Sequence, residues 1–181
     1  MTQNYLTNIE LLTKAISFAA RAHKDQFRKD KRTPYASHVF RVSMVLRHVF
    51  GVADEKVLAA AVLHDTIEDT TTDFDDVDKH FGREIAKWVG ALSKDKRLPQ
   101  EEREKSYRLR LQKAPEAVKF IKLADLYDNI LDSSTSHVHD QLSDTLEKAK
   151  LHIQNLKKRS TPKLSKAVRI VEELIEEKSN K

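Results

Sequence analysis

Apolar residues recur at helical spacing along almost the whole chain, and this pattern constrains the fold more than any other feature. Glycine and proline, the residues that most often interrupt helices, number only 3 and 4. Hydrophobic residues make up 39% of the chain and charged residues 34%, a balance typical of a soluble helical protein. We therefore expect an all-α fold, formed by residues 1–181 as a single domain of about eight to nine helices.

Residues that favour helix ends divide this pattern into segments. Helices are expected at 9–23, 35–51, 55–65, a segment ending near 81, 84–92, segments opening at Pro99 and Pro115, 139–158 and 162–177. Asp54 should cap the third helix, and Gly51 should end the second. Between Val57 and Leu63 the third helix is apolar on every side, which predicts a buried, central position. The C-terminal helices, within 137–179, include a last apolar stripe that predicts core packing, with a homodimer contact as the alternative.

The composition excludes several classes of function. Without cysteine, the chain has no disulfide, no cysteine-bound zinc or iron–sulfur cluster and no thiol nucleophile. Its glycines, Gly51, Gly82 and Gly90, lie too far apart for a dinucleotide fingerprint or a Walker loop. Any phosphate chemistry must therefore use side chains and metal.

Charge and hydropathy restrict the partners and the location. The formal net charge of +5 suits an anionic partner, either nucleic acid or a small polyphosphate. The aromatic residues that would stack on single-stranded nucleic acid are not interleaved with the basic ones, so nucleic acid is disfavoured. No apolar run could span a bilayer, and the N-terminus lacks the pattern of a secretory signal. We expect a cytoplasmic protein without a membrane partner.

The end of the third expected helix, LHDTIED, places one histidine and three carboxylates within a turn and a half. Carboxylates in an apolar setting are costly unless they are paired, protonated or bound to metal. His64 and Glu68 lie four residues apart, as do Asp65 and Asp69, so we expect each pair to share a helix face. One pair could bind an ion while the other orients water. A solvated helix end is the alternative interpretation.

Two further segments supply donors of the same kind. Asp125 lies in line with Val118 and Ile121 on an otherwise apolar face, and Asn129 follows one turn later. This arrangement predicts either a buried hydrogen-bond network or, as we favour, a metal ligand beside an amide that positions water. His38 offers a fourth donor. Two imidazoles and two carboxylates suit manganese, iron(II) or zinc better than calcium or magnesium.

The order His38, His64-Asp65, Asp125 resembles the H…HD…D signature of the HD phosphohydrolase superfamily. The segments HKDQFRKDKRTPYASH, LHDTIEDT and KLADLYDN resemble the hydrolase domain of RelA/SpoT homologues, and the likeness covers residues 9–131. We see no synthetase domain or regulatory tail after them, so the resemblance is closest to the stand-alone small alarmone hydrolases. It implies an HD-domain helical bundle that uses one manganese ion to remove the 3′-diphosphate from (p)ppGpp. The products would be GDP or GTP and pyrophosphate.

The resemblance also implies a role for each site residue. The implied metal ligands are His38, His64, Asp65 and Asp125, and the acidic pair that activates water is Glu68 and Asp69. The implied nucleotide contacts are Arg28, Lys29 and Asn129. Fixed cations suit a nucleotide polyphosphate, and FRKDKR offers four in six residues, although a solvated basic loop would look the same.

Two other functions stay open. One is an HD phosphohydrolase acting on another nucleotide, such as (p)ppApp or NADPH. The other is a non-catalytic nucleotide-binding helical module, which the complete set of ligands and the intact Glu68-Asp69 pair disfavour. Three residues depart from the family pattern, Val39, Arg32 and Leu131, where proline, glycine and arginine are usual. These departures bear on the nucleotide contacts and not on the metal site.

Overall fold

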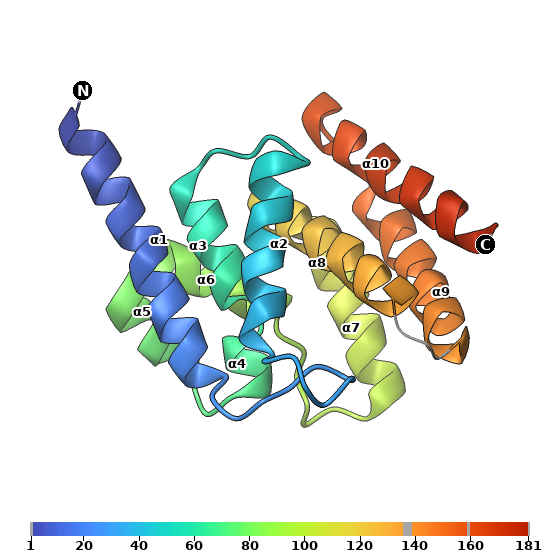
Figure 1. The fold of residues 1–181 in the computed structure, drawn as a ribbon, viewed down its shortest axis with the longest axis horizontal. Helices are drawn as coiled ribbons and strands as arrows, with labels where there is room; N and C mark the ends of the chain where they lie inside the picture. The colour runs from blue at the N-terminus through green and yellow to red at the C-terminus, as the bar shows by residue number, and fades with distance from the viewer. Residues whose placement is uncertain (1, 136–138, 159, 181) are drawn as a thin grey trace.

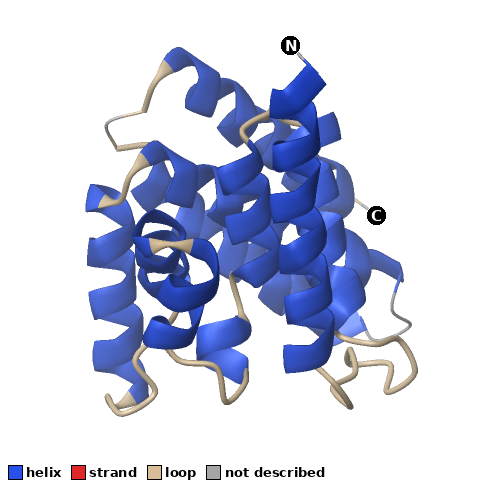
Figure 2. Cartoon of the chain, turned by 90° about the vertical axis from the view of Figure 1, so that its left-hand side faces the viewer, coloured by secondary structure: helices blue, strands red, loops and turns tan. Residues whose placement is uncertain are grey.

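The computed structural model describes residues 2–135, 139–158 and 160–180, and these ranges are helical apart from their connections (Figures 1 and 2). Their helices are α1 Thr2–Ala22, α2 Ala36–His48, α3 Glu55–Leu63, α4 Thr66–Asp69, α5 Phe74–Phe81, α6 Arg83–Leu92, α7 Gln100–Lys113, α8 Glu116–Thr135, α9 His139–Leu156 and α10 Pro162–Ser179. Within the described ranges there is no strand, and one isolated bridge joins Phe27 to Pro34. The all-α fold is confirmed: nine helices exceed one turn, and α4 is a single turn.

Helix α3 lies at the centre of the fold, as its all-round apolar sequence predicts. Every residue from Val57 to Leu63 is buried. The helix packs against α1, α2, α6 and α8, and Figure 1 shows α1 and α2 on either side of it. The Asp54 side chain accepts hydrogen bonds from the backbone N–H groups of Lys56 and Val57, so the predicted cap is confirmed.

Helix α8 connects this centre to the C-terminal helices. It packs against α2, α3 and α6, and also against α9 and α10. The predicted stripe on α10 is buried, and it consists of Leu164, Val168, Val171, Leu174 and Ile175. This stripe therefore packs within the core of the chain. Of the expected C-terminal range, residues 137 and 138 lie outside the described residues, and α9 begins at His139.

Two predicted helix ends are wrong. Helix α2 ends at His48 rather than at Gly51, and Gly51 turns the chain afterwards with φ 67°, a conformation that glycine adopts at little cost. The third helix ends at Leu63 rather than at Asp65. There the hydroxyl of Thr66 donates to the carbonyl of Leu63 at 2.7 Å, replacing the backbone N–H that a longer helix would have supplied.

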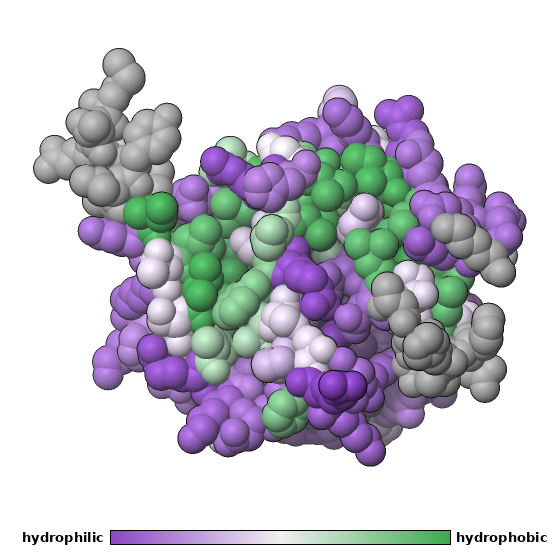
Figure 3. All heavy atoms as spheres, viewed as in Figure 1, coloured by the Kyte–Doolittle hydropathy of each residue, from purple (hydrophilic) through white to green (hydrophobic). Residues whose placement is uncertain are grey.

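One face of α1 leaves apolar side chains at the surface. Ile16 is 37% exposed, beside a groove of about 620 Å³ between α1, α2 and α3. Figure 3 shows hydrophobic side chains gathered over this part of the molecule. In the described part of the chain, no helix is both long and apolar enough to cross a membrane.

Candidate active site

Four side chains from three parts of the fold meet at one point. His38 comes from the first turn of α2, His64 and Asp65 from the junction of α3 and α4, and Asp125 from the middle of α8. His38 Nε2 lies 3.6 Å from Asp65 Oδ2 and 3.3 Å from Asp125 Oδ1. His64 Nε2 lies 3.0 and 3.8 Å from the same two oxygens. The structure thus brings together the four predicted metal ligands, although His38 and Asp125 are about 90 residues apart in the sequence.

The end of α3 explains how two consecutive residues reach the same point. Successive side chains of an α-helix diverge by about 100°, so His64 and Asp65 could not converge inside one. Here α3 has already ended, and Asp65 adopts φ −98° and ψ −3° before α4 begins. Across the break, His64 and Glu68 still line the same pocket, and the backbone N–H of Asp69 donates to the carbonyl of Asp65 at 2.9 Å, as in one helical turn.

Hydrogen bonds at Nδ1 direct Nε2 of both imidazoles into the site. His64 Nδ1 lies 2.8 Å from the carbonyl oxygen of Ala61, and a carbonyl can only accept, so this nitrogen carries the proton. His38 Nδ1 lies 2.7 Å from Asp128 Oδ2. His64 Nε2 is buried and forms no hydrogen bond with any of the described residues. Buried polar atoms are nearly always paired, so this orphaned nitrogen, facing two carboxylates, fits a divalent cation.

The two carboxylates are themselves held by neighbouring side chains. Tyr35 Oη donates to Asp65 Oδ2 at 2.6 Å. Lys122 Nζ donates to Asp125 Oδ2 at 2.7 Å, and Asn129 Nδ2 donates to Asp125 Oδ1 at 2.5 Å. Burial would raise the pKa of Asp125, but the positive charge of Lys122 and the interactions with His38 and His64 together outweigh it and hold this pKa well below its usual range. Asp125 is therefore an anion.

Glu68 and Asp69, the predicted acidic pair, have different surroundings. Glu68 lines a pocket of about 180 Å³ with the four candidate ligands, whereas Asp69 is not among the lining residues. The backbone N–H of Lys94 donates to Glu68 Oε2 at 2.8 Å, and burial raises the pKa of Glu68. Asp69 instead pairs with Lys96 at 2.7 Å. Of the two, Glu68 is placed to take a proton from water in the pocket.

The three predicted nucleotide contacts also differ in where they lie relative to the pocket. Asn129 lines the pocket, and its Oδ1 accepts from Arg28 Nη2 at 3.0 Å. Arg28 also pairs with Asp132 at 2.7 Å, and its side chain is only 12% exposed. Lys29 is exposed and does not line the pocket. Arg28 and Asn129 therefore lie beside the site, and Lys29 does not.

Several residues around the site did not stand out in the sequence. They are Tyr35, Arg41, Lys94, Lys122 and Asp128. Helical spacing could have indicated three of them, because Arg41 follows His38 by three residues, and Lys122 and Asp128 flank Asp125 at the same distance. Tyr35 and Lys94 reach the site from loops, for which no periodic signal exists.

Comparisons with known proteins point to the same region. A family model described as an HD domain matches residues 15–153. The guanosine-3′,5′-bis(diphosphate) 3′-pyrophosphohydrolase MESH1 of Xenopus tropicalis is 43% identical over 126 residues, 67% of this chain and 69% of that protein. The human protein of the same name is 44% identical over 125 residues, 67% of this chain and 68% of its own.

A solved structure gives a similar result at the level of the fold. It is that of a metazoan SpoT orthologue described as hydrolysing ppGpp and playing a role in starvation responses. The match has a TM-score of 0.78 and 32% sequence identity, and it covers 89% of this chain and 93% of that one.

Proposed function

Because this chain belongs to the HD-domain family, we propose that it is a metal-dependent pyrophosphohydrolase that removes the 3′-diphosphate from (p)ppGpp. The products are GDP or GTP and pyrophosphate. One observation carries this proposal: four side chains of the kinds that bind metal ions converge beside Glu68 in a single pocket. The similarity to proteins named as 3′-pyrophosphohydrolases supports the choice of substrate.

The proposed ligands of one divalent cation are His38, His64, Asp65 and Asp125. When bound there, a divalent cation polarises a phosphoryl oxygen and favours deprotonation of water. We propose manganese because the resemblance to the small alarmone hydrolases implies it, and a site of mixed nitrogen and oxygen character suits that ion. The tautomer that Ala61 imposes on His64 leaves the Nε2 lone pair available for such an ion.

Glu68 is the proposed general base. With Oε2 held by the N–H of Lys94, its other oxygen can accept a proton from the attacking water. The water oxygen then bonds to phosphorus, and the bond between phosphorus and the ribose 3′ oxygen breaks. That oxygen leaves with the nucleotide and takes up a proton. Burial raises the pKa of Glu68, which makes the carboxylate a better base than an exposed one.

The substrate is proposed to be bound by cations in and beside the pocket. Lys94 and Lys122 line the pocket together with Asn129, and Arg28 lies beside it and donates to Asn129. A nucleotide with two diphosphates carries enough negative charge to need several such partners. We place this reaction in the cytoplasm, in a chain that acts as one domain. A homodimer stays a prediction.

Product analysis tests this function. The protein with Mn²⁺ is incubated separately with guanosine tetraphosphate and with its adenosine counterpart, and the products are separated by ion-exchange chromatography. We expect GDP and pyrophosphate in equal amounts from the guanosine substrate. Release of inorganic phosphate instead of pyrophosphate would contradict the proposed bond cleavage, and faster turnover of the adenosine substrate would contradict the proposed base preference.

A further inference from the structure

The two ring nitrogens of His38 have different partners, and only one faces the proposed metal position. Nε2 points toward Asp65 and Asp125, while Nδ1 lies 2.7 Å from Asp128 Oδ2. Asp128 is 2% exposed and does not line the pocket. A carboxylate buried this deeply needs donors around it, so the groups that surround Asp128 indicate what it does.

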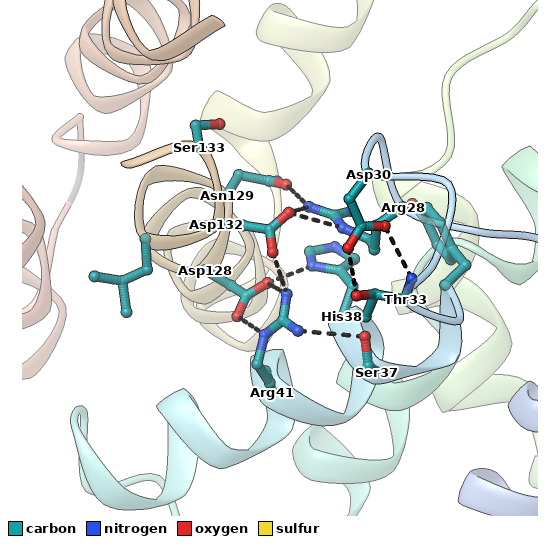
Figure 4. Close-up of polar contacts among 12 residues, drawn as sticks. Arg28, Asp30, Thr33, Ser37, His38, Arg41, Asp128, Asn129, Asp132 and Ser133 are labelled. Atoms are coloured by element: carbon teal, nitrogen blue, oxygen red, sulfur yellow. Dashed lines mark hydrogen bonds and ion pairs between the residues drawn. The ribbon is translucent and has the colours of Figure 1, made fainter. Parts of the chain in front are cut away.

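Arg41 supplies most of these donors. Its Nε donates to Asp128 Oδ1 at 2.6 Å, and its Nη2 donates to Asp128 Oδ2 at 2.9 Å, as Figure 4 shows. Such two-pronged pairs fix the plane of a carboxylate as well as its position. With both oxygens held by the guanidinium of Arg41, Asp128 is a carboxylate that accepts hydrogen bonds.

We propose that Asp128 is a positioning residue for His38, and that Arg41 holds Asp128 in the orientation this requires. The proposal rests on the proposed function, because His38 is there a metal ligand. An ionised carboxylate can only accept, so it keeps the proton of a neutral His38 on Nδ1. The Nε2 lone pair is then free and points at the cation position.

The ion pairs continue from Arg41 to the basic loop. Arg41 Nη2 also donates to Asp132 Oδ1 at 3.0 Å, and Asp132 Oδ2 pairs with Arg28 at 2.7 Å (Figure 4). Asp132 thus shares Arg41 with Asp128 and lies on the same helix, but the side chain of Asp132 is 31% exposed and that of Asp128 only 3%. D132N is therefore a matched control for D128N, because each variant removes one carboxylate that contacts Arg41.

The test compares Mn²⁺ affinity, measured by electron paramagnetic resonance of the free ion, in D128N and D132N. In D128N an NH₂ group replaces one of the two carboxylate oxygens, and it faces a hydrogen-bond donor in either orientation. In one orientation the donor is Arg41 Nε, and in the other the donors are His38 Nδ1 and Arg41 Nη2. If the NH₂ group faces His38, the imidazole proton is driven to Nε2, where it blocks the cation. We expect Mn²⁺ to bind about 10–100-fold more weakly to D128N. D132N should stay within about twofold of the parent protein, since the Asp132 carboxylate pairs with Arg41 and Arg28 rather than with a candidate metal ligand.

The rate at saturating Mn²⁺ provides a second readout. If Asp128 acts through His38, excess Mn²⁺ should restore most of the hydrolysis by D128N, whereas general damage to the fold would not respond to metal. Equal Mn²⁺ affinity in D128N and D132N would overturn the proposal. Should D128N not fold, R41A replaces it, and affinity equal to that of D132N would again contradict us. The affinity comparison needs no substrate, so absent hydrolysis in the parent protein would count against the proposed function alone.

Discussion

Asp65 and Glu68 lie three residues apart, and their proposed roles predict different failures. D65A removes a ligand, so it should lose both Mn²⁺ binding and activity. E68Q keeps an acceptor for the N–H of Lys94 but removes the base, so it should bind Mn²⁺ normally and turn over about 10²–10⁴-fold more slowly. Mn²⁺ titration combined with single-turnover hydrolysis distinguishes the two.

D69N is the control for E68Q, because it neutralises the neighbouring carboxylate, which pairs with Lys96 outside the pocket lining. We expect a much smaller loss of rate than in E68Q. A larger loss in D69N, with metal bound in both variants, would transfer the role of base to Asp69.

Arg28 and Lys29 are adjacent in sequence, but only Arg28 contacts a residue that lines the pocket. R28A should raise KM by about 10–100-fold, the value of one charge-assisted hydrogen bond, with a smaller change in kcat. K29A removes the same charge from an exposed position and should raise KM less. Steady-state kinetics on both variants checks this, and a fall in kcat at unchanged KM in R28A would refute the assignment.

His152 makes folding stability depend on pH. Burial, followed by the positive charges of Lys122 and Lys94, lowers the pKa of His152 to about 3. The unfolded chain, with an ordinary histidine pKa of about 6.5, binds more protons between these values, so stability falls as pH drops below about 6.5. From pH 7 to pH 5 this histidine should account for about 2 kcal/mol of lost unfolding free energy.

Urea unfolding of the parent protein and of H152Q at both pH values measures this contribution. Glutamine does not titrate, so H152Q should lose less stability on acidification, and groups common to both proteins cancel in the comparison. Parallel pH dependence in the two proteins would show that His152 titrates normally in the folded state.

At the scale of the residue, the sequence could predict the polar side chains that stand out because their surroundings are apolar. His64, Asp65 and Asp125 are polar residues on or beside apolar stripes, and the structure brings them together. Asp128 and Arg41 lack such a contrast, because charged residues at helical spacing are usual on a solvated face. Their burial depends on how α2 and α8 pack, which no local pattern reveals.

At the scale of the element, the break between α3 and α4 determines the geometry of the site. Thr66 is fully buried, and its hydroxyl satisfies the carbonyl of Leu63 where α3 ends. T66V keeps the volume but leaves this carbonyl unpaired, so it should destabilise the protein by about 1–3 kcal/mol. It should also weaken Mn²⁺ binding, because His64 and Asp65 lie at the break.

T66S retains the hydroxyl and serves as the control in thermal unfolding and Mn²⁺ titration. If T66S were as damaging as T66V, loss of the hydrogen bond could not be the explanation, because serine keeps the hydroxyl group. The sequence did not predict this break, because HDTIED contains neither glycine nor proline and Thr66 acts through its side chain. The start of α3 was predictable, since Asp54 is a strong capping residue.

At the scale of the whole molecule, α8 brings the parts of the site together. It carries Asp125 and Asn129 against α2 and α3, while α9 and α10 pack against it as well. Helical periodicity predicted the elements, including the buried stripe of α10, but it contains no information on which helices touch. The convergence of His38, His64 and Asp125 was expected for two reasons. Their order resembles a known signature, and polar groups on apolar helices need a shared partner.

The central claim is that these four side chains hold one divalent ion. Crystals of the protein grown with Mn²⁺ and measured at the manganese absorption edge locate that ion directly. We predict one anomalous peak within about 2.0–2.4 Å of His38 Nε2, His64 Nε2 and a carboxylate oxygen of each of Asp65 and Asp125. The peak should disappear in D65A. A peak elsewhere, or none at this position at saturating Mn²⁺, would contradict the account.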